Sequence, residues 1–137
     1  MKKYLLVIAL LIKSPFLFGA EVINLQSIAG KSQSEVQVVL GAATSCSESK
    51  HGKKCFFEAG ETEIVFIKGK ADWITVEGFD NIAFDEKALD ALGLIPTTPD
   101  FKNEFTMRWI SLEGYLEVSL FKGVSNLDYA NIKVATK

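Results

Sequence analysis

Residues 30–55 read GKSQSEVQVVLGAATSCSESKHGKKC, and the local signals in this stretch predict the unit around which the fold is built. Ser32 and Glu35 have the spacing of a capping box, in which each side chain accepts a hydrogen bond from the other residue's backbone N–H. Gly41 supplies the left-handed residue that commonly ends a helix. The stretch therefore predicts a short scaffold helix, followed by a loop that two cysteines could close. Three residues at helical spacing give this helix an apolar face that needs a sheet to pack against: Val36, Val39 and Leu40.

The first twenty residues have the layout of a secretory signal, with a basic start, an apolar run and a small-residue end. A membrane helix is the alternative, but the uninterrupted run Tyr4–Ile12 is too short to cross about 30 Å of hydrocarbon before Lys13 interrupts it. No cysteine lies near the end of this segment, so we expect no lipid anchor. The sequence predicts a signal peptide over 1–20 and a periplasmic or secreted mature domain over 21–137, without a membrane span.

The mature domain contains two cysteines, Cys46 and Cys55. In an exported protein an even number of cysteines favours a disulfide, and a loop this short would stabilise the fold by roughly 2.5–3 kcal/mol. A metal site is the sharper alternative, because His51 lies between the two cysteines. A structural zinc site usually has four ligands, however, and this spacing fits no standard pattern. Free thiols are the third alternative.

Composition and charge indicate the type of domain and exclude some classes of partner. Of 137 residues, 48% are hydrophobic and 23% are charged, which is ordinary for one globular domain. Residues 21–137 contain 12 basic and 17 acidic side chains, a net charge of −5. An acidic domain is a poor partner for nucleic acid or for anionic lipid, since both require a basic surface.

After the cysteine loop, the chain alternates between short runs of β-forming residues and glycine-containing turns, a pattern typical of antiparallel hairpins. A second helix is predicted over Glu86–Leu92, capped by Asp85 and ended by Gly93. The proline-containing segment 95–103 predicts an extended loop. Six strands are expected: Cys55–Glu58, Glu61–Lys68, Ala71–Glu77, Thr106–Leu112, Tyr115–Lys122 and Leu127–Ala135. Residues 21–29 could form either a strand or a helical lead-in.

The two halves of the chain resemble each other. AGETEIVFIKG (59–69) aligns without a gap on EGYLEVSLFKG (113–123), and VVLGAAT aligns on DALGLIPT at nearly the same offset. This pattern predicts a single α+β domain made of two repeats, about 30–78 and 82–136, each with one helix and three strands. Side by side, the repeats would form one antiparallel sheet with both helices packed on one face. Chance matching of glycine-turn hairpins is the alternative.

The capped helix, its glycine stop and the cysteine-flanked loop together resemble the β-lactamase-inhibitor-protein-like fold. That group is related to the small lipoprotein of the outer-membrane barrel-assembly machinery. The resemblance implies an exported, non-enzymatic protein that binds other proteins through a sheet face. It covers about a quarter of the mature chain, and the second half lacks the cysteine pair. It is carried by Gly30, Lys31, Ser32, Val36, Gly41, Cys46, Gly52 and Cys55.

Alternation along the predicted strands assigns side chains to two faces of the sheet. One set is apolar enough to lie under the helices, and the other mixes aromatic and polar side chains, the composition of protein-binding surfaces. Burial of these aromatic residues by their neighbours is the alternative. The candidate binding residues are Trp73, Tyr115, Phe121 and Tyr129.

Catalytic motifs are missing from this sequence. His51 is the only histidine, the cysteines are expected to be paired, and no glycine-rich phosphate loop occurs, so we expect no enzyme and no cofactor. The sequence favours a binding module, inhibitor-like or immunity-like, with a protein partner in the cell envelope. Two alternatives stay open: a structural protein that helps maintain the outer membrane, and a small-ligand binder with a pocket between the sheet and the 94–105 loop.

Overall fold

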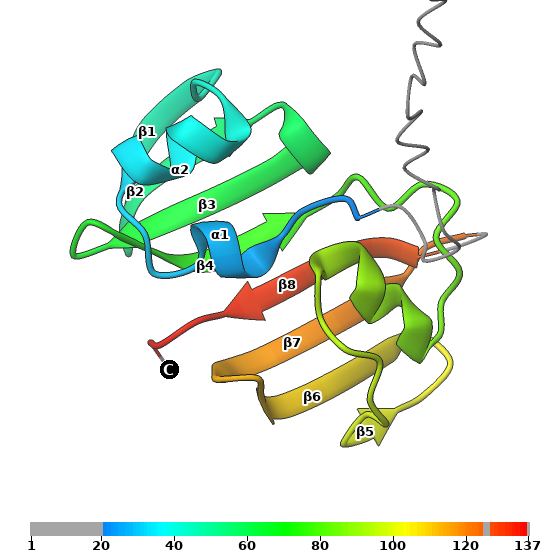
Figure 1. The fold of residues 1–137 in the computed structure, drawn as a ribbon. Coiled ribbons are helices and arrows are strands. Elements are labelled where there is room, and N and C mark those ends of the chain that lie inside the picture. Colours follow the sequence, from blue (N-terminus) through cyan, green and yellow to red (C-terminus); the bar gives the residue numbers. More distant parts are fainter. Residues whose placement is uncertain (1–20, 125–126, 137) are drawn as a thin grey trace, which may run out of the picture.

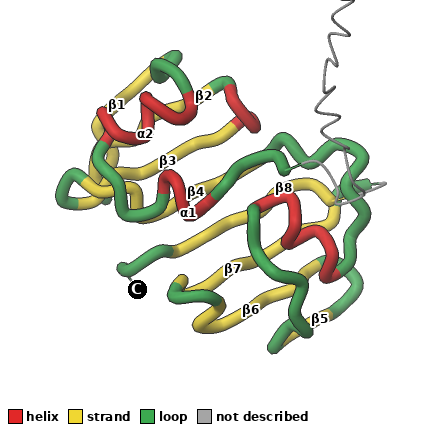
Figure 2. Tube along the Cα trace, viewed as in Figure 1, coloured by secondary structure: helices red, strands yellow, loops and turns green. Residues whose placement is uncertain are grey.

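The computed structural model describes residues 21–124 and 127–136, so the predicted signal peptide lies outside the described residues. The described chain is α+β and contains eight strands with a few short helices (Figures 1 and 2). The helices are α1 (Leu25–Ile28), α2 (Gln33–Leu40), η1 (Ala59–Glu61) and η2 (Glu86–Leu92). The strands are β1 (Ser45–Ser49), β2 (Gly52–Phe57), β3 (Thr62–Ile67), β4 (Lys70–Val76), β5 (Phe101–Lys102), β6 (Thr106–Leu112), β7 (Tyr115–Lys122) and β8 (Leu127–Lys133).

All eight strands form one antiparallel sheet in the order β1-β2-β3-β4-β8-β7-β6-β5. The sheet is continuous because β4, from the first half of the chain, pairs with β8, from the second. No helix in the described part of the chain is long and apolar enough to cross a membrane.

The sequence predicts six strands, and this number is wrong. The structure adds β1, in a segment predicted to be a loop, and the two-residue strand β5. The sequence of β1, SCSES, has no hydrophobic alternation because β1 is an edge strand with almost no buried surface. Its pairing with β2 therefore comes from backbone hydrogen bonds and the covalent link described below, not from an apolar face.

The predicted capping box of α2 is confirmed. The Ser32 side chain accepts a hydrogen bond from the Glu35 backbone N–H at 3.2 Å, and the Glu35 carboxylate accepts one from the Ser32 N–H at 3.1 Å. The predicted apolar face is only partly correct. Val36 is fully buried and Leu40 packs against the core, but Val39 is exposed. Because α2 has only about two turns, few of its side chains can contact the sheet.

The predicted disulfide is also present, between Cys46 and Cys55. The two residues face each other across β1 and β2, with their Cα atoms 4.1 Å apart, so the bond staples an edge strand to its neighbour. Cys55 is buried in the core, whereas Cys46 is exposed. Because both sulfur atoms are in the bond, neither is left as a thiolate for a metal ion.

The second predicted helix has the expected bounds but is a 3₁₀ helix. The Asp85 side chain accepts a hydrogen bond from the Lys87 N–H at 2.8 Å, and Gly93 adopts the left-handed conformation with φ of 73°. Leu89 and Leu92 are fully buried. Residues 21–29 form the helical lead-in rather than a strand, since α1 buries both of its apolar side chains.

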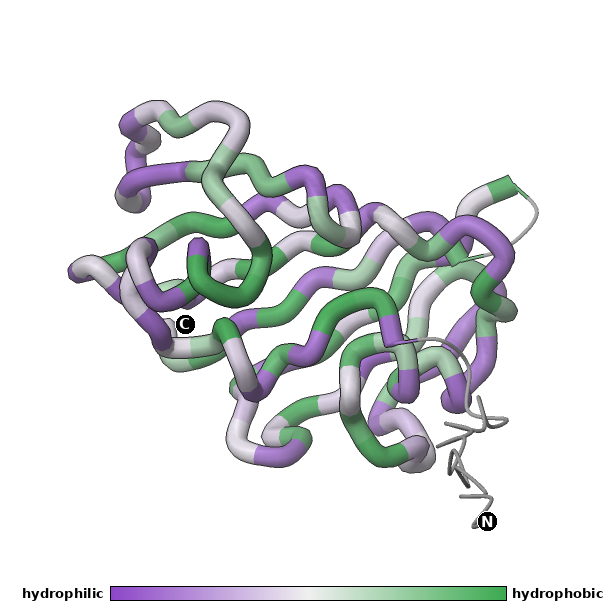
Figure 3. Tube along the Cα trace, turned by 45° about the horizontal axis from the view of Figure 1, so that its top comes forward, coloured by the Kyte–Doolittle hydropathy of each residue, from purple (hydrophilic) through white to green (hydrophobic). Residues whose placement is uncertain are grey.

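One hydrophobic core unites the helices with alternate residues of the strands. Figure 3 shows the alternation of hydrophobic and hydrophilic residues along the central strands. Buried side chains of α1, α2 and η2 join those of β3, β4, β7 and β8 in a single cluster. Its central members are Leu25, Ile28, Val36, Ile64, Ile74, Leu89, Leu92, Val118, Leu120 and Ile132.

Substitution of Ser32 tests how much the capping box of α2 contributes to the stability of the fold. Ser32→Ala should lower the free energy of unfolding by about 1 kcal/mol, because it leaves an N-terminal backbone N–H without its partner. The Ser32 backbone N–H, and then its hydroxyl, hold the pKa of the Glu35 carboxyl below its ordinary value. The stabilisation that the ionised Glu35 carboxylate gives to the capping box is therefore present at neutral pH and is lost as the pH falls through that lowered pKa. Urea unfolding at two pH values measures both effects, with the exposed Ser47→Ala as the control.

Removal of the disulfide tests how much the Cys46–Cys55 bond contributes to the stability of the fold. The Cys46→Ala/Cys55→Ala variant should lose roughly 2.5–3 kcal/mol of stability, because an unfolded chain without the crosslink gains loop entropy. Guanidinium unfolding should show the same loss when the wild-type protein is reduced. Equal stability of the reduced and oxidised proteins would contradict the assignment of a stabilising role to this bond.

Candidate protein-binding surface

Along each strand, side chains that belong to the hydrophobic core alternate with side chains on the opposite face of the sheet. That opposite face carries the candidate site, and we call it the alternate face. The printed strand register aligns its side chains in two rows that run across the sheet from β2 to β6 or β5. The first row is Lys54, Val65, Trp73, Lys133, Glu117 and Ile110. The second is Phe56, Glu63, Thr75, Asn131, Ser119, Arg108 and Phe101.

An ion-pair network lies in these rows over β6, β7 and β8. Arg108 Nε lies 3.1 Å from Glu117 Oε1, and Lys133 Nζ lies 4.0 Å from Glu117 Oε2. Arg108 Nε also donates to the Ser119 hydroxyl at 3.3 Å. Arg108 is the only arginine in the sequence, and its partners Glu117 and Ser119 both come from the neighbouring strand β7. Two cations thus share one carboxylate, which leaves one positive charge in excess.

Trp73 lies beside this network on β4. Its ring is 4.7 Å from the ring of His51 at an interplanar angle of 49°, and the Lys133 ammonium lies 6.0 Å from the indole centroid. The indole nitrogen is buried and donates to no acceptor among the described residues. His51 is exposed, as expected of a loop residue, and it also covers one side of the tryptophan. Trp73 is therefore half-buried and held in place by its neighbours.

Phe121 and Tyr129 form a second aromatic group on the alternate face. They are direct partners in the β7–β8 register, and their rings stack with centroids 4.6 Å apart at 22°. Both side chains are half-buried. The cross-strand contact gives a rigid aromatic surface at the edge of the two rows.

The placement of Tyr115 on the alternate face is wrong. Its side chain is only 7% exposed and belongs to the hydrophobic core, together with its cross-strand partner Leu112. Strict alternation fails at this end of the hairpin because Ser111 and Glu113 have positive φ angles of 56° and 47°. Leu116, which strict alternation from the buried Val118 would turn towards the core, is instead half-buried and borders a surface hollow.

Three exposed apolar residues of the rows were not among the predicted site residues. Phe56 is 36%, Phe101 46% and Ile110 53% exposed, and they lie at the two ends of the rows. The Arg108 guanidinium carbon lies 5.8 Å from the centre of the Phe101 ring. Alternation alone could have placed Ile110, whose strand was predicted, but Phe101 required knowledge of the short strand β5.

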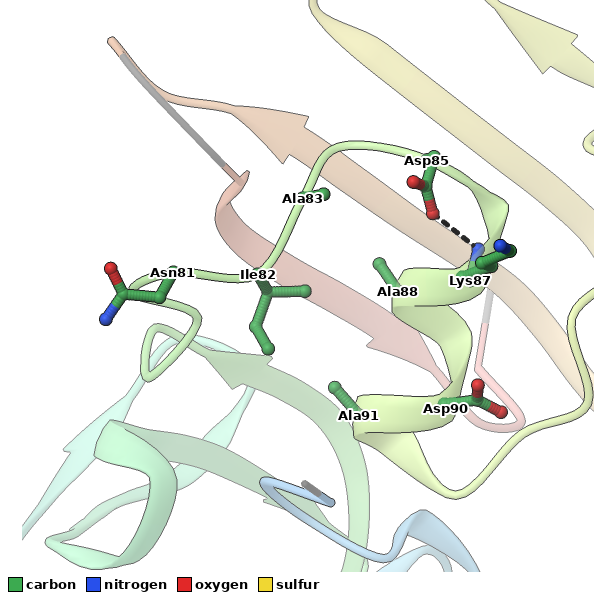
Figure 4. Close-up of a pocket in the computed structure, with 8 residues that line it drawn as sticks. All are labelled: Asn81, Ile82, Ala83, Asp85, Lys87, Ala88, Asp90 and Ala91. Carbon is green, nitrogen blue, oxygen red and sulfur yellow. Dashed lines mark hydrogen bonds between the residues drawn. The ribbon is translucent and has the colours of Figure 1, made fainter. Parts of the chain in front are cut away.

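The surface contains several hollows. One of about 460 Å³ lies at the Ile110 end of the first row, lined by Ile110, Ser111, Leu116, Glu117 and Lys133. A second, of about 300 Å³, lies between the loop before η2 and η2 itself, where Ile82 faces Ala88 and Ala91 (Figure 4). A third, of about 300 Å³, includes Lys70 and Asp72. None of these three is lined by the 94–105 loop, where the small-ligand alternative places its pocket.

Within residues 21–124 and 127–136, no group of three histidine, cysteine, aspartate or glutamate side chains could hold a metal ion. The pKa of Glu35 is lowered and that of Tyr115 is raised, and both shifts follow from local structure. The chemistry of the alternate face is that of ion pairs, aromatic rings and exposed apolar side chains.

No family model, characterised protein or solved structure matches this chain. The resemblance to the β-lactamase-inhibitor-protein-like fold therefore stays a prediction from the sequence motif.

Titration of the Tyr115 phenol tests whether this side chain is buried. Desolvation, and to a lesser degree the Glu113 carboxylate, raise the pKa of its phenol above 10.0. We expect Tyr115 to ionise above that value, with its contribution to stability present below the unfolded pKa and lost as the pH rises through the folded one. Ultraviolet absorbance of phenolate measures this, and Tyr115→Phe should remove the high-pH part of the curve. A curve unchanged by that substitution would contradict the buried placement.

Proposed function

We propose that this chain is an exported, non-enzymatic protein-binding module and that its alternate face is the binding surface. The observation that carries the proposal is the composition of the two rows: apolar side chains are exposed at both ends, and an ion-pair network lies between them. With strands about 4.8 Å apart, the rows extend across about 24 Å from β2 to β6. This is the width of a small protein interface.

We expect the aromatic residues to contribute most of the binding free energy. Trp73, Phe121 and Tyr129 are half-buried, and each ring is fixed by a neighbouring ring. Rings that are already ordered lose little conformational entropy when a partner covers them. Tryptophan and tyrosine are also the residues most enriched among binding hot spots.

The finer architecture belongs to the same proposal: two repeated halves, with the helices on one face of the sheet. The strand order supports the repeats, because β3 and β7, or β2 and β6, lie at equal distances from the central β4–β8 pair. In Figure 1, α1 and α2 are drawn in front of the β1–β4 half and η2 in front of the other half, which supports the one-face arrangement. The alternate face would then be left uncovered.

Export is supported by the disulfide between Cys46 and Cys55 and by the signal-like sequence over 1–20. Disulfides persist in oxidising compartments such as the periplasm and the extracellular space. A partner in the cell envelope follows from this location. The module would act there by occupying a surface of its partner rather than by catalysing a reaction.

A pull-down with paired variants tests the proposal. The tagged mature domain (21–137) is incubated with envelope extract beside a Trp73→Ala/Tyr129→Ala variant, each checked for folding by circular dichroism. We expect a partner that the wild type retains and the variant loses, with affinity reduced about thirtyfold or more, as for hot-spot truncation.

The matched control is Val38→Ala/Val39→Ala, which removes two exposed apolar side chains from α2; Val38 is 86% exposed. This variant should retain the partner. If the folded Trp73→Ala/Tyr129→Ala protein retained every partner, the alternate face would not be the binding surface. Fractionation with membranes and no retained partner would instead favour an envelope-structural role.

A further inference from the structure

The alternate face differs in charge from the rest of the domain. Its two rows carry three cationic side chains, Lys54, Arg108 and Lys133, and two anionic ones, Glu63 and Glu117. Residues 21–137 together carry a net charge of −5. The rows are therefore net positive on an acidic domain, so an acidic partner would be attracted to this face and repelled elsewhere.

The excess positive charge lies next to a hollow that both apolar and charged side chains line. Arg108 and Lys133 both bind the single carboxylate of Glu117, and Arg108 makes the closer contact at 3.1 Å against 4.0 Å for Lys133. An ammonium group has three N–H donors, so Lys133 can bind a second carboxylate without leaving Glu117. Its side chain also lines the hollow of about 460 Å³.

The hollow itself suits a large apolar side chain. Ile110 and Leu116 supply apolar walls, and Ile110 is 53% exposed, so a side chain that covered it would remove apolar surface from water. The outer edge of β6 is less suited to adding a strand here. The Asp100 carboxylate already accepts a hydrogen bond from the Ile110 N–H at 2.7 Å. Recognition at this end of the row thus depends on side chains.

From this geometry we infer the chemistry of the partner: a segment in which a large apolar residue enters the Ile110–Leu116 hollow while an adjacent Asp or Glu binds Lys133. This inference rests on the proposed function and adds the class of segment that is recognised. The apolar anchor supplies affinity, and the carboxylate supplies orientation and faster association.

A random peptide library displayed on phage tests the inference without knowledge of the natural partner. Selection on the folded mature domain should enrich peptides with an acidic residue beside Leu, Ile, Phe or Trp. A selected peptide, synthesised and measured by calorimetry, should bind about tenfold more weakly to Lys133→Met and to Ile110→Ala. Lys133→Met keeps the length of the side chain and removes only its charge.

The matched control is Lys87→Met on η2, which removes an exposed cation that belongs to neither row and does not line the hollow, and which should leave the affinity unchanged. Lys133→Glu should shift the selection towards basic peptides. Enrichment without acidic residues, affinity unaffected by Lys133→Met, or no enrichment at all would overturn the inference. A natural partner lost by Trp73→Ala/Tyr129→Ala but kept by Lys133→Met would overturn it while the proposed function stands.

Discussion

The pairing of β4 with β8 is the interaction on which the rest of the structure depends. It joins strands from the two halves of the chain, and neither half alone is large enough to bury a substantial core. On the core side it brings Ile74 against Ile132, both fully buried. On the other side it places Trp73 beside Lys133, so one set of backbone hydrogen bonds creates both the core and the centre of the alternate face. Asp72 extends the junction: its buried carboxylate accepts hydrogen bonds from the N–H groups of the two residues that follow Val134.

Local signals in the sequence predicted the features that depend only on neighbouring residues. The caps at Ser32 and Asp85 have the expected hydrogen bonds, because a cap involves atoms within three residues of each other. The strand β1 was missed because it lies at an edge, where no buried face imposes an alternating pattern. Hydrophobic periodicity records burial rather than hydrogen bonding, so a strand with little burial has almost no signal.

The site was less predictable than the fold because its contacts cross between strands. Alternation placed Trp73, Phe121 and Tyr129 on the alternate face in the registered strands, but it failed for Tyr115, where positive φ angles at the hairpin end reverse the side-chain direction. The contact between Arg108 and Glu117 requires the β6–β7 register, which no local pattern specifies. Aromatic residues could therefore be assigned to a face, whereas the charges between them could be assigned only from the structure.

The charged residues and the exposed apolar residues of the alternate face contribute less to the stability of the domain than the core does. Its ion pairs are partly exposed, and such pairs typically stabilise a fold by at most about 1 kcal/mol. Phe101 and Ile110 leave apolar surface in water, where burial would have stabilised the chain. The domain thus leaves exposed apolar residues in line with a charged network, and the proposed partner would cover both. Under the proposed function, substitutions of the partly exposed charged residues and of Phe101 and Ile110 should therefore change recognition with little loss of stability.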